Sequence, residues 1–313
     1  MKTISILSAL CFIILSCTQS KNSDTDEQGV SSSKTRSINA VKDFEIEPFE
    51  DSEEGRLAEY GQSLINETYK YFYEEDGEKI GNHLACKSCH LDGGTKPFAA
   101  PYVGLTSVFP TYIGREDKIE SLEERVNGCF ERSMNGKAIP EDGKEMKAII
   151  AYMAHLSKDV ATEERIEGQG MGDFEPPMRK ANLEAGQLVY KEKCQSCHME
   201  DGHGLKLPNE ESYIYPPLWG PDSYNDGAGM SRILTAAKFI KRNMPLGTTY
   251  DNPQLTDEET FDVAAYINSF DRPEKANKEL DYPDLSKKPK DTHYPPYDDD
   301  ISQEQHKYGP FNF

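Results

Sequence analysis

The stretch CKSCH at residues 86–90 recurs as CQSCH at residues 194–198, and the sequence around the two copies also repeats. Each copy is followed by a loop rich in Pro, Gly and aromatic residues, and then by two apolar segments. The closing segments read AIIAYMAHLS (148–157) and DVAAYINSF (262–270). Internal repetition determines the architecture of a chain before any local detail does. Because the apolar spacing is helical rather than alternating, the sequence predicts an all-α protein with two tandem domains.

The pattern C-x-x-C-H is the attachment signature of c-type haem, in which two thiols bind the macrocycle and the adjacent histidine binds the iron. A CxxC pair alone would also fit a redox disulfide or half of a zinc site, but further Cys or His at paired zinc spacing is missing from the sequence. We therefore predict two covalently bound haem c groups. Their residues are Cys86, Cys89 and His90 for haem 1 and Cys194, Cys197 and His198 for haem 2. Each half then resembles a class I cytochrome c domain.

The composition limits the partners of the chain. Its 313 residues include 35 Lys plus Arg and 55 Asp plus Glu, which gives a net charge of −20. This charge argues against nucleic acid and against electrostatic docking on anionic membranes, whereas it would suit a basic cytochrome as redox carrier. Hydrophobic residues make up 36% of the chain, which is below the globular average and indicates tether or tail segments.

The N-terminus has the features of an export signal. An apolar run of thirteen residues (4–16) is too short to cross a membrane, which takes about 20 such residues. The run ends in Ile14-Leu15-Ser16-Cys17, which resembles a bacterial lipobox, whose cysteine becomes the lipid-modified first residue. An ordinary signal peptide is the alternative, but an A-x-A-like cleavage site is missing. We expect an exported, periplasmic lipoprotein that contacts the membrane through a lipid on Cys17 alone.

The rest of the chain divides at stretches rich in Gly, Pro and charged residues. The expected segments are a signal peptide (1–16), a flexible tether (17–50), an N-terminal cytochrome c domain (51–160), a linker (161–180), a C-terminal cytochrome c domain (181–272) and an extended C-terminal tail (273–313).

Each haem iron needs a sixth ligand, and Met244 is the candidate for haem 2. It stands directly before Pro245, and proline disfavours helix at the preceding residue, so Met244 lies where the chain leaves a predicted helix. This resembles the Met-Pro ligand of class I cytochromes, and His/Met ligation raises the potential. Met230 and Met199 are weaker candidates, and a core methionine is the alternative role for Met244.

For haem 1, spacing alone favours Met134, but Cys129 precedes it on the same predicted helix. Helical periodicity places Arg125, Cys129, Arg132 and Ser133 on one face. Nearby arginines lower the pKa of a thiol and favour the thiolate, which binds iron and attacks sulfur. Cys129 could instead be a small buried hydrophobic residue, and the arginines could pair with Glu on a solvated face. The residues alone leave these alternatives open.

Three longer runs, at 81–104, 122–140 and 215–247, resemble the dihaem thiosulfate dehydrogenases, cytochromes that interconvert thiosulfate and tetrathionate. The likeness covers roughly residues 55–285. It implies an oxidoreductase that couples two thiosulfate ions to tetrathionate, or runs the reverse, with electrons passing from haem 1 to haem 2 and then to an external carrier. The alternative function is a dihaem electron carrier without its own substrate, in which Met134 holds haem 1. A dihaem peroxidase is a third and weaker alternative.

The resemblance also implies the site residues. In the family, the active-site haem has His and Cys as axial ligands, so Cys129 opposite His90 is the expected pair. Arginines would bind the sulfonate oxygens and offset the repulsion between two dianions. The implied catalytic residues are Cys129, Arg125, Arg115, Ser133 and, less directly, Arg132. Some members exchange a Lys with the adjacent Met at the second haem. Asn243 stands at that position here, which implies a fixed His198/Met244 pair.

Overall fold

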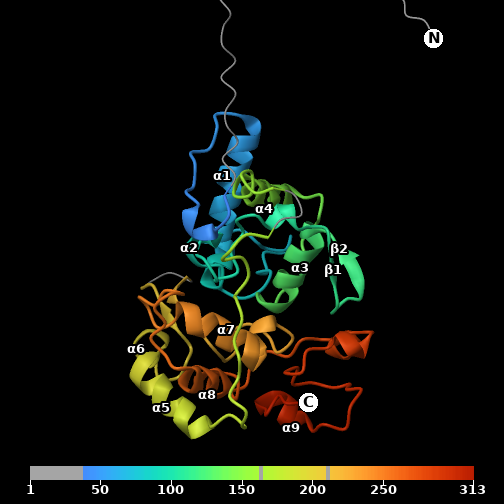
Figure 1. Cartoon of the computed structure of the whole chain (residues 1–313). Helices are drawn as coiled ribbons and strands as arrows, with labels where there is room; N and C mark the ends of the chain where they lie inside the picture. The colour runs from blue at the N-terminus through green and yellow to red at the C-terminus, as the bar shows by residue number, and fades with distance from the viewer. Residues whose placement is uncertain (1–37, 162–164, 209–211) are drawn as a thin grey trace, which may run out of the picture. The chain divides into compact units, whose positions relative to one another are not determined.

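The computed structural model describes residues 38–161, 165–208 and 212–313, so the predicted signal peptide, Cys17 and most of the predicted tether lie outside the described ranges. Two helical halves follow each other along the chain (Figure 1) and belong to one compact unit, residues 36–313. Within the described ranges, none of the helices combines the length and the apolar character needed to cross a membrane.

Each half is built around two long helices that pack against each other. The pairs are α1 (Glu53–Asn66) with α4 (Lys144–His155), and α5 (Leu183–Lys193) with α8 (Asp257–Ile267). The middle helices are α3 (Leu122–Arg132) and α7 (Ile233–Asn243). Shorter elements are α2 (Leu91–Gly94), α6 (Gln195–His198), α9 (Gln303–Tyr308) and two antiparallel hairpins, β1 (Thr111–Ile113) with β2 (Lys118–Glu120) and β3 (Leu205–Lys206) with β4 (Tyr213–Tyr215). The predicted all-α class is confirmed, with two small hairpins added.

The long helices approach each other at the same kind of residue in both halves. A Cβ added to Gly61 on α1 would lie 1.9 Å from the carbonyl oxygen of Ala148 on α4. A Cβ added to Gly186 on α5 would lie 2.1 Å from the carbonyl oxygen of Asp262 on α8. Both glycines open the segments that repeat in the sequence, and both allow two helix backbones to touch.

Helix α3 has a fixed beginning and a fixed end, which matters because it carries Cys129. At its start the Ser121 side chain accepts from the Glu124 amide at 3.1 Å, and the Glu124 carboxylate accepts from the Ser121 amide at 2.8 Å. This reciprocal pair satisfies two main-chain donors of the first turn. At its end the amide of Met134 donates to the carbonyl of Cys129 at 3.0 Å. The helix therefore presents Cys129 from a rigid position.

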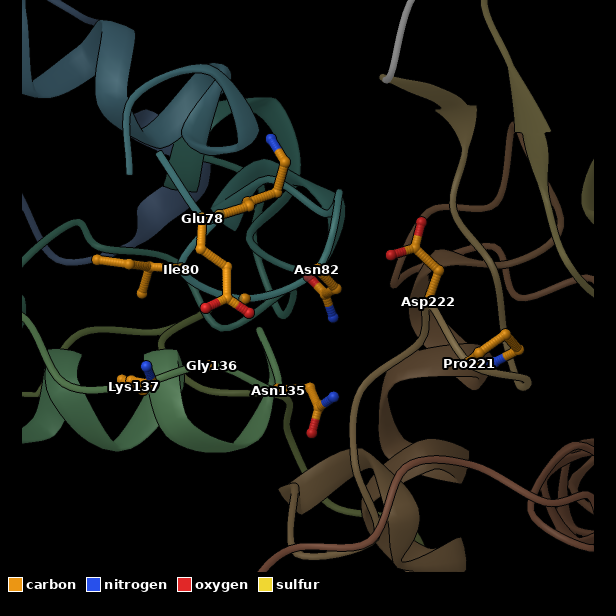
Figure 2. A pocket seen from close by; sticks show the side chains of 10 residues that line it. Glu78, Ile80, Asn82, Asn135, Gly136, Lys137, Pro221 and Asp222 are labelled. Atoms are coloured by element: carbon orange, nitrogen blue, oxygen red, sulfur yellow. The ribbon is translucent and has the colours of Figure 1, made fainter. Parts of the chain in front are cut away.

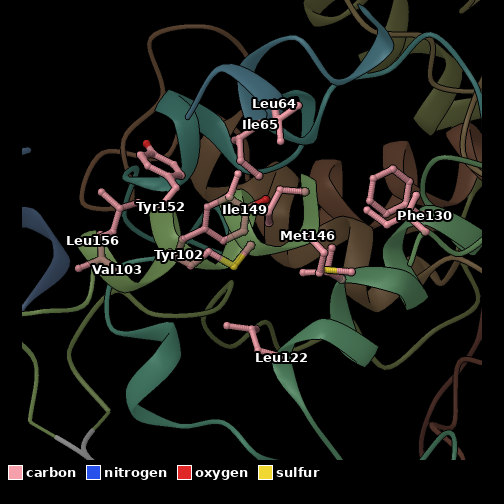
Figure 3. Close-up of a cluster of buried hydrophobic side chains, with 14 of the residues drawn as sticks. Leu64, Ile65, Tyr102, Val103, Leu122, Phe130, Met146, Ile149, Tyr152 and Leu156 are labelled. Carbon is pink, nitrogen blue, oxygen red and sulfur yellow. The ribbon is translucent and has the colours of Figure 1, made fainter. Parts of the chain in front are cut away.

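The core of the first half lies between α1, α3 and α4. Fully buried side chains from α1 and α4 meet there, as Figure 3 shows. They include Leu64, Ile65, Met146, Ile149 and Tyr152. The Tyr152 hydroxyl donates to the Gly93 carbonyl at 2.9 Å, which ties α4 to the segment after the first CxxCH motif. Burial of such apolar area is the main force that holds this segment in place.

Parts of the predicted tether, linker and C-terminal tail are packed into the fold. Ile38 and Val41, from the end of the tether, are buried in the first core, and the Val41 amide donates to Glu167 in the linker at 2.8 Å. Ile166 of the linker is buried in the same core. The C-terminal tail contains the helix α9 and buried residues, among them Tyr294. The isolated apolar residues of these segments are buried against the two halves, although the sequence shows no periodic pattern that would predict this burial.

We expect Gly61→Ala to destabilise the fold by about 2 kcal/mol or more, because the new methyl group collides with the α4 backbone. Chemical denaturation followed by circular dichroism measures the loss. Gly229→Ala is the matched control, since the nearest heavy atom to its added Cβ is a Thr235 methyl at 3.9 Å. Equal stability of the two variants would contradict the close helix contact.

Candidate functional site

Two histidines, one in each half, are held by the same kind of main-chain contact. His90 Nδ1 lies 2.6 Å from the carbonyl oxygen of Ala100, and His198 Nδ1 lies 2.8 Å from the carbonyl oxygen of Pro216. A carbonyl oxygen can only accept, so Nδ1 carries the proton in both rings and Nε2 keeps its lone pair. Histidines that bind a metal are usually oriented by such a bond from their other nitrogen. Both rings are therefore prepared to ligate iron through Nε2.

The paired thiols of the motifs are free and largely protected from solvent. Burial raises the pKa of Cys86 to about 11, and the thiol accepts a hydrogen bond from the Thr68 hydroxyl at 3.3 Å. Burial likewise raises the pKa of Cys89 and of Cys194 to about 12. Protonated thiols beside an oriented imidazole are the donor set that covalent haem c requires. The residues present in both halves therefore fit this group.

Cys129 differs from these thiols in its electrostatics. Burial raises its pKa, but the charge of Arg125 and a hydrogen bond with His90 lower it. The charge of Arg115 lowers it further, and the resulting pKa is about 7. A thiol of this pKa is about half thiolate at pH 7, and the thiolate is the form that binds metals and reacts with sulfur. Cys129 therefore faces His90 as a reactive or ligating group.

Met134, the alternative partner for His90, lies beyond the end of α3. Its side chain is 5% exposed and packs into the core of the first half. Its carbonyl oxygen accepts from the Asn82 amide at 2.7 Å, which fixes the chain at this point. Met134 thus fills the place of a core residue, whereas Cys129 is the residue that interacts with His90. The geometry favours Cys129 as the sixth ligand of haem 1.

Two of the predicted arginines lie near enough to Cys129 for their charges to lower its pKa. Arg125 is exposed on α3, one turn before Cys129. Arg115, in the turn between β1 and β2, is partly exposed, and its Nε donates to the Tyr282 hydroxyl at 3.5 Å. Ser133 is partly exposed at the C-terminal cap of α3, one turn after Cys129. Arg115 and Arg125 thus place two positive charges near one thiol, and Ser133 lies one helical turn from it.

Arg132 does not belong to this group. Its guanidinium forms a two-pronged ion pair with Asp281 at 2.7 and 2.9 Å and donates to the Gly227 carbonyl at 3.2 Å. The side chains of Arg132 and Asp281 are 9% and 7% exposed. The Asp281 carboxylate offsets the positive charge of Arg132, and the bonds to Asp281 and Gly227 occupy both of its terminal nitrogens, which makes it a poor site for an anionic substrate. The expectation that Arg132 binds substrate is therefore replaced by a structural role, which helical periodicity alone could not reveal.

At the second site, α7 ends at Asn243, and the backbone of Met244 is extended, as its position before Pro245 predicts. Met244 is partly buried and packs against the apolar cluster of the second half, which also contains Cys194 and Met230. Asn243 is 1% exposed and its amide donates to the carbonyls of Phe98 and Phe239 at 3.1 and 3.0 Å. These bonds hold Met244 at a fixed place in the chain, so Met244 stays the preferred sixth ligand over Met230.

A hollow of about 320 Å³ lies at the seam between the halves (Figure 2). Residues 78–82 and 135–137 line one side of it, and Pro221 and Asp222 line the other. Figure 2 shows Asn82 and Asp222 on opposite sides of this space. Cys129 and the arginines are not among its lining residues. The candidate site is therefore the thiol and its cations, rather than this hollow.

Two residues that contact these arginines were not predicted from the sequence. Asp281 pairs with Arg132, and Tyr282 contacts Arg115. Both lie near the start of the predicted C-terminal tail, where neither periodicity nor a motif marks them. Burial lowers the pKa of Arg115, but Tyr282, Tyr294 and Asp281 together raise it above its usual value, so its guanidinium stays charged.

Comparisons with known proteins match both halves of the chain. Residues 69–162 match the family described as SoxA/TsdA, cytochrome c domain, and residues 183–271 match the cytochrome c family. The thiosulfate dehydrogenase of Psychrobacter arcticus is 40% identical over 233 residues, which cover 74% of this chain and 68% of that protein. The thiosulfate dehydrogenase of Allochromatium vinosum is 42% identical over 198 residues, which cover 62% of this chain and 72% of that protein.

A solved structure agrees with these matches. The thiosulfate dehydrogenase (TsdBA) from Marichromatium purpuratum superposes with a TM-score of 0.67 at 33% identity. The match covers 73% of this chain and 49% of that chain, so the present chain spans about half the length of that protein. Both predicted cytochrome c domains are confirmed by the family matches.

We expect Cys129→Ser to change the visible absorption and electron paramagnetic resonance spectra of one haem, because a hydroxyl replaces the thiolate opposite His90. Both haems should remain attached, since Cys86, Cys89, Cys194 and Cys197 are untouched. Met134→Leu is the control and should leave both spectra as in the wild type. Spectra altered by Met134→Leu and unaltered by Cys129→Ser would exchange the two assignments.

We expect Arg132→Met to lower the free energy of unfolding by about 3 kcal/mol, because it leaves Asp281 buried without its counter-charge. Arg125→Met, the same change at an exposed position of the same helix, should alter it by less than about 0.5 kcal/mol. Denaturant titration of the two holoproteins measures the difference. Similar losses for both variants would show that Arg132 is not the structural arginine.

Proposed function

The chain belongs to the thiosulfate dehydrogenase family, and we propose that Cys129 and the arginines beside it carry out that family's reaction at haem 1. The protein is a dihaem cytochrome c enzyme that joins two thiosulfate ions into tetrathionate and releases two electrons. The observation that supports the assignment to these residues is a thiol of lowered pKa between His90 and two arginine charges.

The residues that would hold the cofactors follow from the two motifs. Cys86, Cys89, Cys194 and Cys197 would form the thioether bonds. His90 and Cys129 would ligate the iron of haem 1, and His198 and Met244 that of haem 2. When bound, the two haems accept one electron each from the reaction.

The first task of the protein is to hold two dianions close together. Two charges of −2 at about 5 Å repel each other by roughly 3 kcal/mol even in water, and by more in a drier site. Arg115 and Arg125 offset this repulsion, and their planar forks match the oxygens of a sulfonate group. The Ser133 hydroxyl can donate one further hydrogen bond. The sulfonate ends are thereby held by cations, which leaves the terminal sulfurs to meet at Cys129.

Cys129 also offers a route for the sulfur chemistry. When Cys129 is not bound to iron, its thiolate and the terminal sulfur of one thiosulfate form an S–S bond as two electrons leave for the haems. The terminal sulfur of a second thiosulfate then attacks the sulfur bonded to Cys129. Tetrathionate forms, and Cys129 leaves as the thiolate. Atoms and charge balance over the two steps, and the reverse sequence reduces tetrathionate.

The electrons must leave the protein, and we propose that they do so through haem 2 to an external redox carrier. The net charge of −20 would suit a carrier with a basic surface, such as a basic cytochrome. Membership of this family supports export to the periplasm. The lipobox-like sequence at Cys17 supports attachment to the membrane by a lipid.

We expect the holoprotein to reduce ferricyanide when thiosulfate is added, and Cys129→Gly to lower this rate by about 100-fold or more with both haems retained. Met134→Leu should keep at least a large part of the rate. The reverse reaction is measured with tetrathionate and a reduced viologen donor. Absence of activity in both directions would leave an electron carrier without its own substrate.

A further inference from the structure

The C-terminal segment from Asp281 to Tyr297, which lies beyond both matched cytochrome c regions, contacts Arg115 of the candidate site and the structural Arg132. Its residues Asp281, Tyr282 and Tyr294 are 7%, 5% and 5% exposed. Polar side chains that are buried this deeply are held by specific partners. This segment, here named the C-terminal strap, is therefore part of the folded site.

Tyr282 contacts Arg115 through both its main chain and its side chain. The Tyr282 amide donates to the Arg115 carbonyl at 2.7 Å, which fixes the backbone of the β1–β2 turn. The Arg115 Nε donates to the Tyr282 hydroxyl at 3.5 Å, and the guanidinium carbon lies 5.9 Å from the ring centroid. One residue of the strap thus holds both the main chain and the side chain of Arg115.

The strap is itself anchored next to this contact. Asp281 forms the buried ion pair with Arg132, and the Tyr294 hydroxyl donates to the same carboxylate at 2.6 Å. Further along, Lys288 Nζ lies 4.8 Å from the Tyr294 ring centroid and donates to the Pro296 carbonyl at 2.7 Å. A cation over an aromatic face adds to the rigidity of such a segment. Tyr282 therefore lies between two anchored parts of the strap, Asp281 on one side and Lys288 with Tyr294 on the other.

The strap treats its two arginines differently. It gives Arg132 a direct ion pair with the Asp281 carboxylate, whereas Arg115 is hydrogen-bonded to the Tyr282 hydroxyl and interacts with Asp281 only at longer range. The hydroxyl bond occupies Nε alone and leaves the two terminal nitrogens of Arg115 to bind oxygen acceptors. An arginine that is held in place and still charged suits an incoming anion, because less side-chain freedom is lost on binding.

We propose that the C-terminal strap forms a wall of the anion site and that Tyr282 is a positioning residue, which orients Arg115 toward the sulfonate group of thiosulfate. This inference rests on the proposed function of the Cys129 site. It predicts that loss of the Tyr282 hydroxyl weakens substrate binding without disturbing either haem.

The test compares Tyr282→Phe with Tyr297→Phe in the haem-loaded protein. Both variants lose one hydroxyl from the strap, but the Tyr297 hydroxyl donates to the Thr292 carbonyl at 3.1 Å, within the strap itself. We expect Tyr282→Phe to raise the KM for thiosulfate about 5- to 10-fold with a smaller change in kcat, because one bond to a charged group is lost. Tyr297→Phe should keep the wild-type KM, and both variants should keep the wild-type spectrum.

A double-mutant cycle shows whether Tyr282 acts through Arg115. In the background of Arg115→Met, the further change Tyr282→Phe should leave kcat/KM unaltered within about twofold, since its target is gone. An equal effect of Tyr282→Phe in both backgrounds would overturn the positioning role, and so would a wild-type KM in the single variant. An inactive wild-type holoprotein would instead overturn the proposed function and this inference together.

Discussion

The site depends on a short hydrogen bond that orients a histidine. His90 Nδ1 donates to the carbonyl of Ala100, ten residues further along the chain, and this bond turns Nε2 toward Cys129. His198 makes the equivalent bond to Pro216 in the second half. A ring without this bond could rotate or change its tautomer, and a metal ligand would be lost. The helices and the buried thiols of each half surround a histidine that is already set in its working orientation.

The arginines around α3 differ in the residues that they contact. Arg132 faces the second half and the C-terminal strap, where it forms an ion pair with the buried Asp281. Arg125 faces solvent beside Cys129, and Arg115 reaches the same thiol from the β1–β2 turn. A nearby cation lowers the pKa of a thiol. Of the two arginines on this helix, one is in a buried ion pair, and the other remains the predicted binding residue.

Several features were readable from local pattern. The repeated CxxCH motifs predicted both haem sites, and Pro245 predicted the end of the helix before Met244, where α7 does end. The choice between Cys129 and Met134 was less secure, because both lie at plausible spacing. The hydrogen bond with His90 supports Cys129, which stays a prediction. Helical periodicity placed Arg132 with Arg125, and it misled because it ranks residues by the face of their own helix. It contains no information about a carboxylate 149 residues away.

The sequence by itself determined the all-α class and the two repeated halves, and it predicted the residues that attach the haems. Helical period, internal repetition and the CxxCH motif are all patterns that can be read along the chain. Tertiary structure alone decided which arginine pairs with a buried carboxylate and which one is bonded to a tyrosine hydroxyl. Asp281 and Tyr282 come from a segment without periodicity or motif, and they reach Arg132 and Arg115 only after both halves have folded. Contacts between residues so far apart depend on packing, which local pattern does not encode.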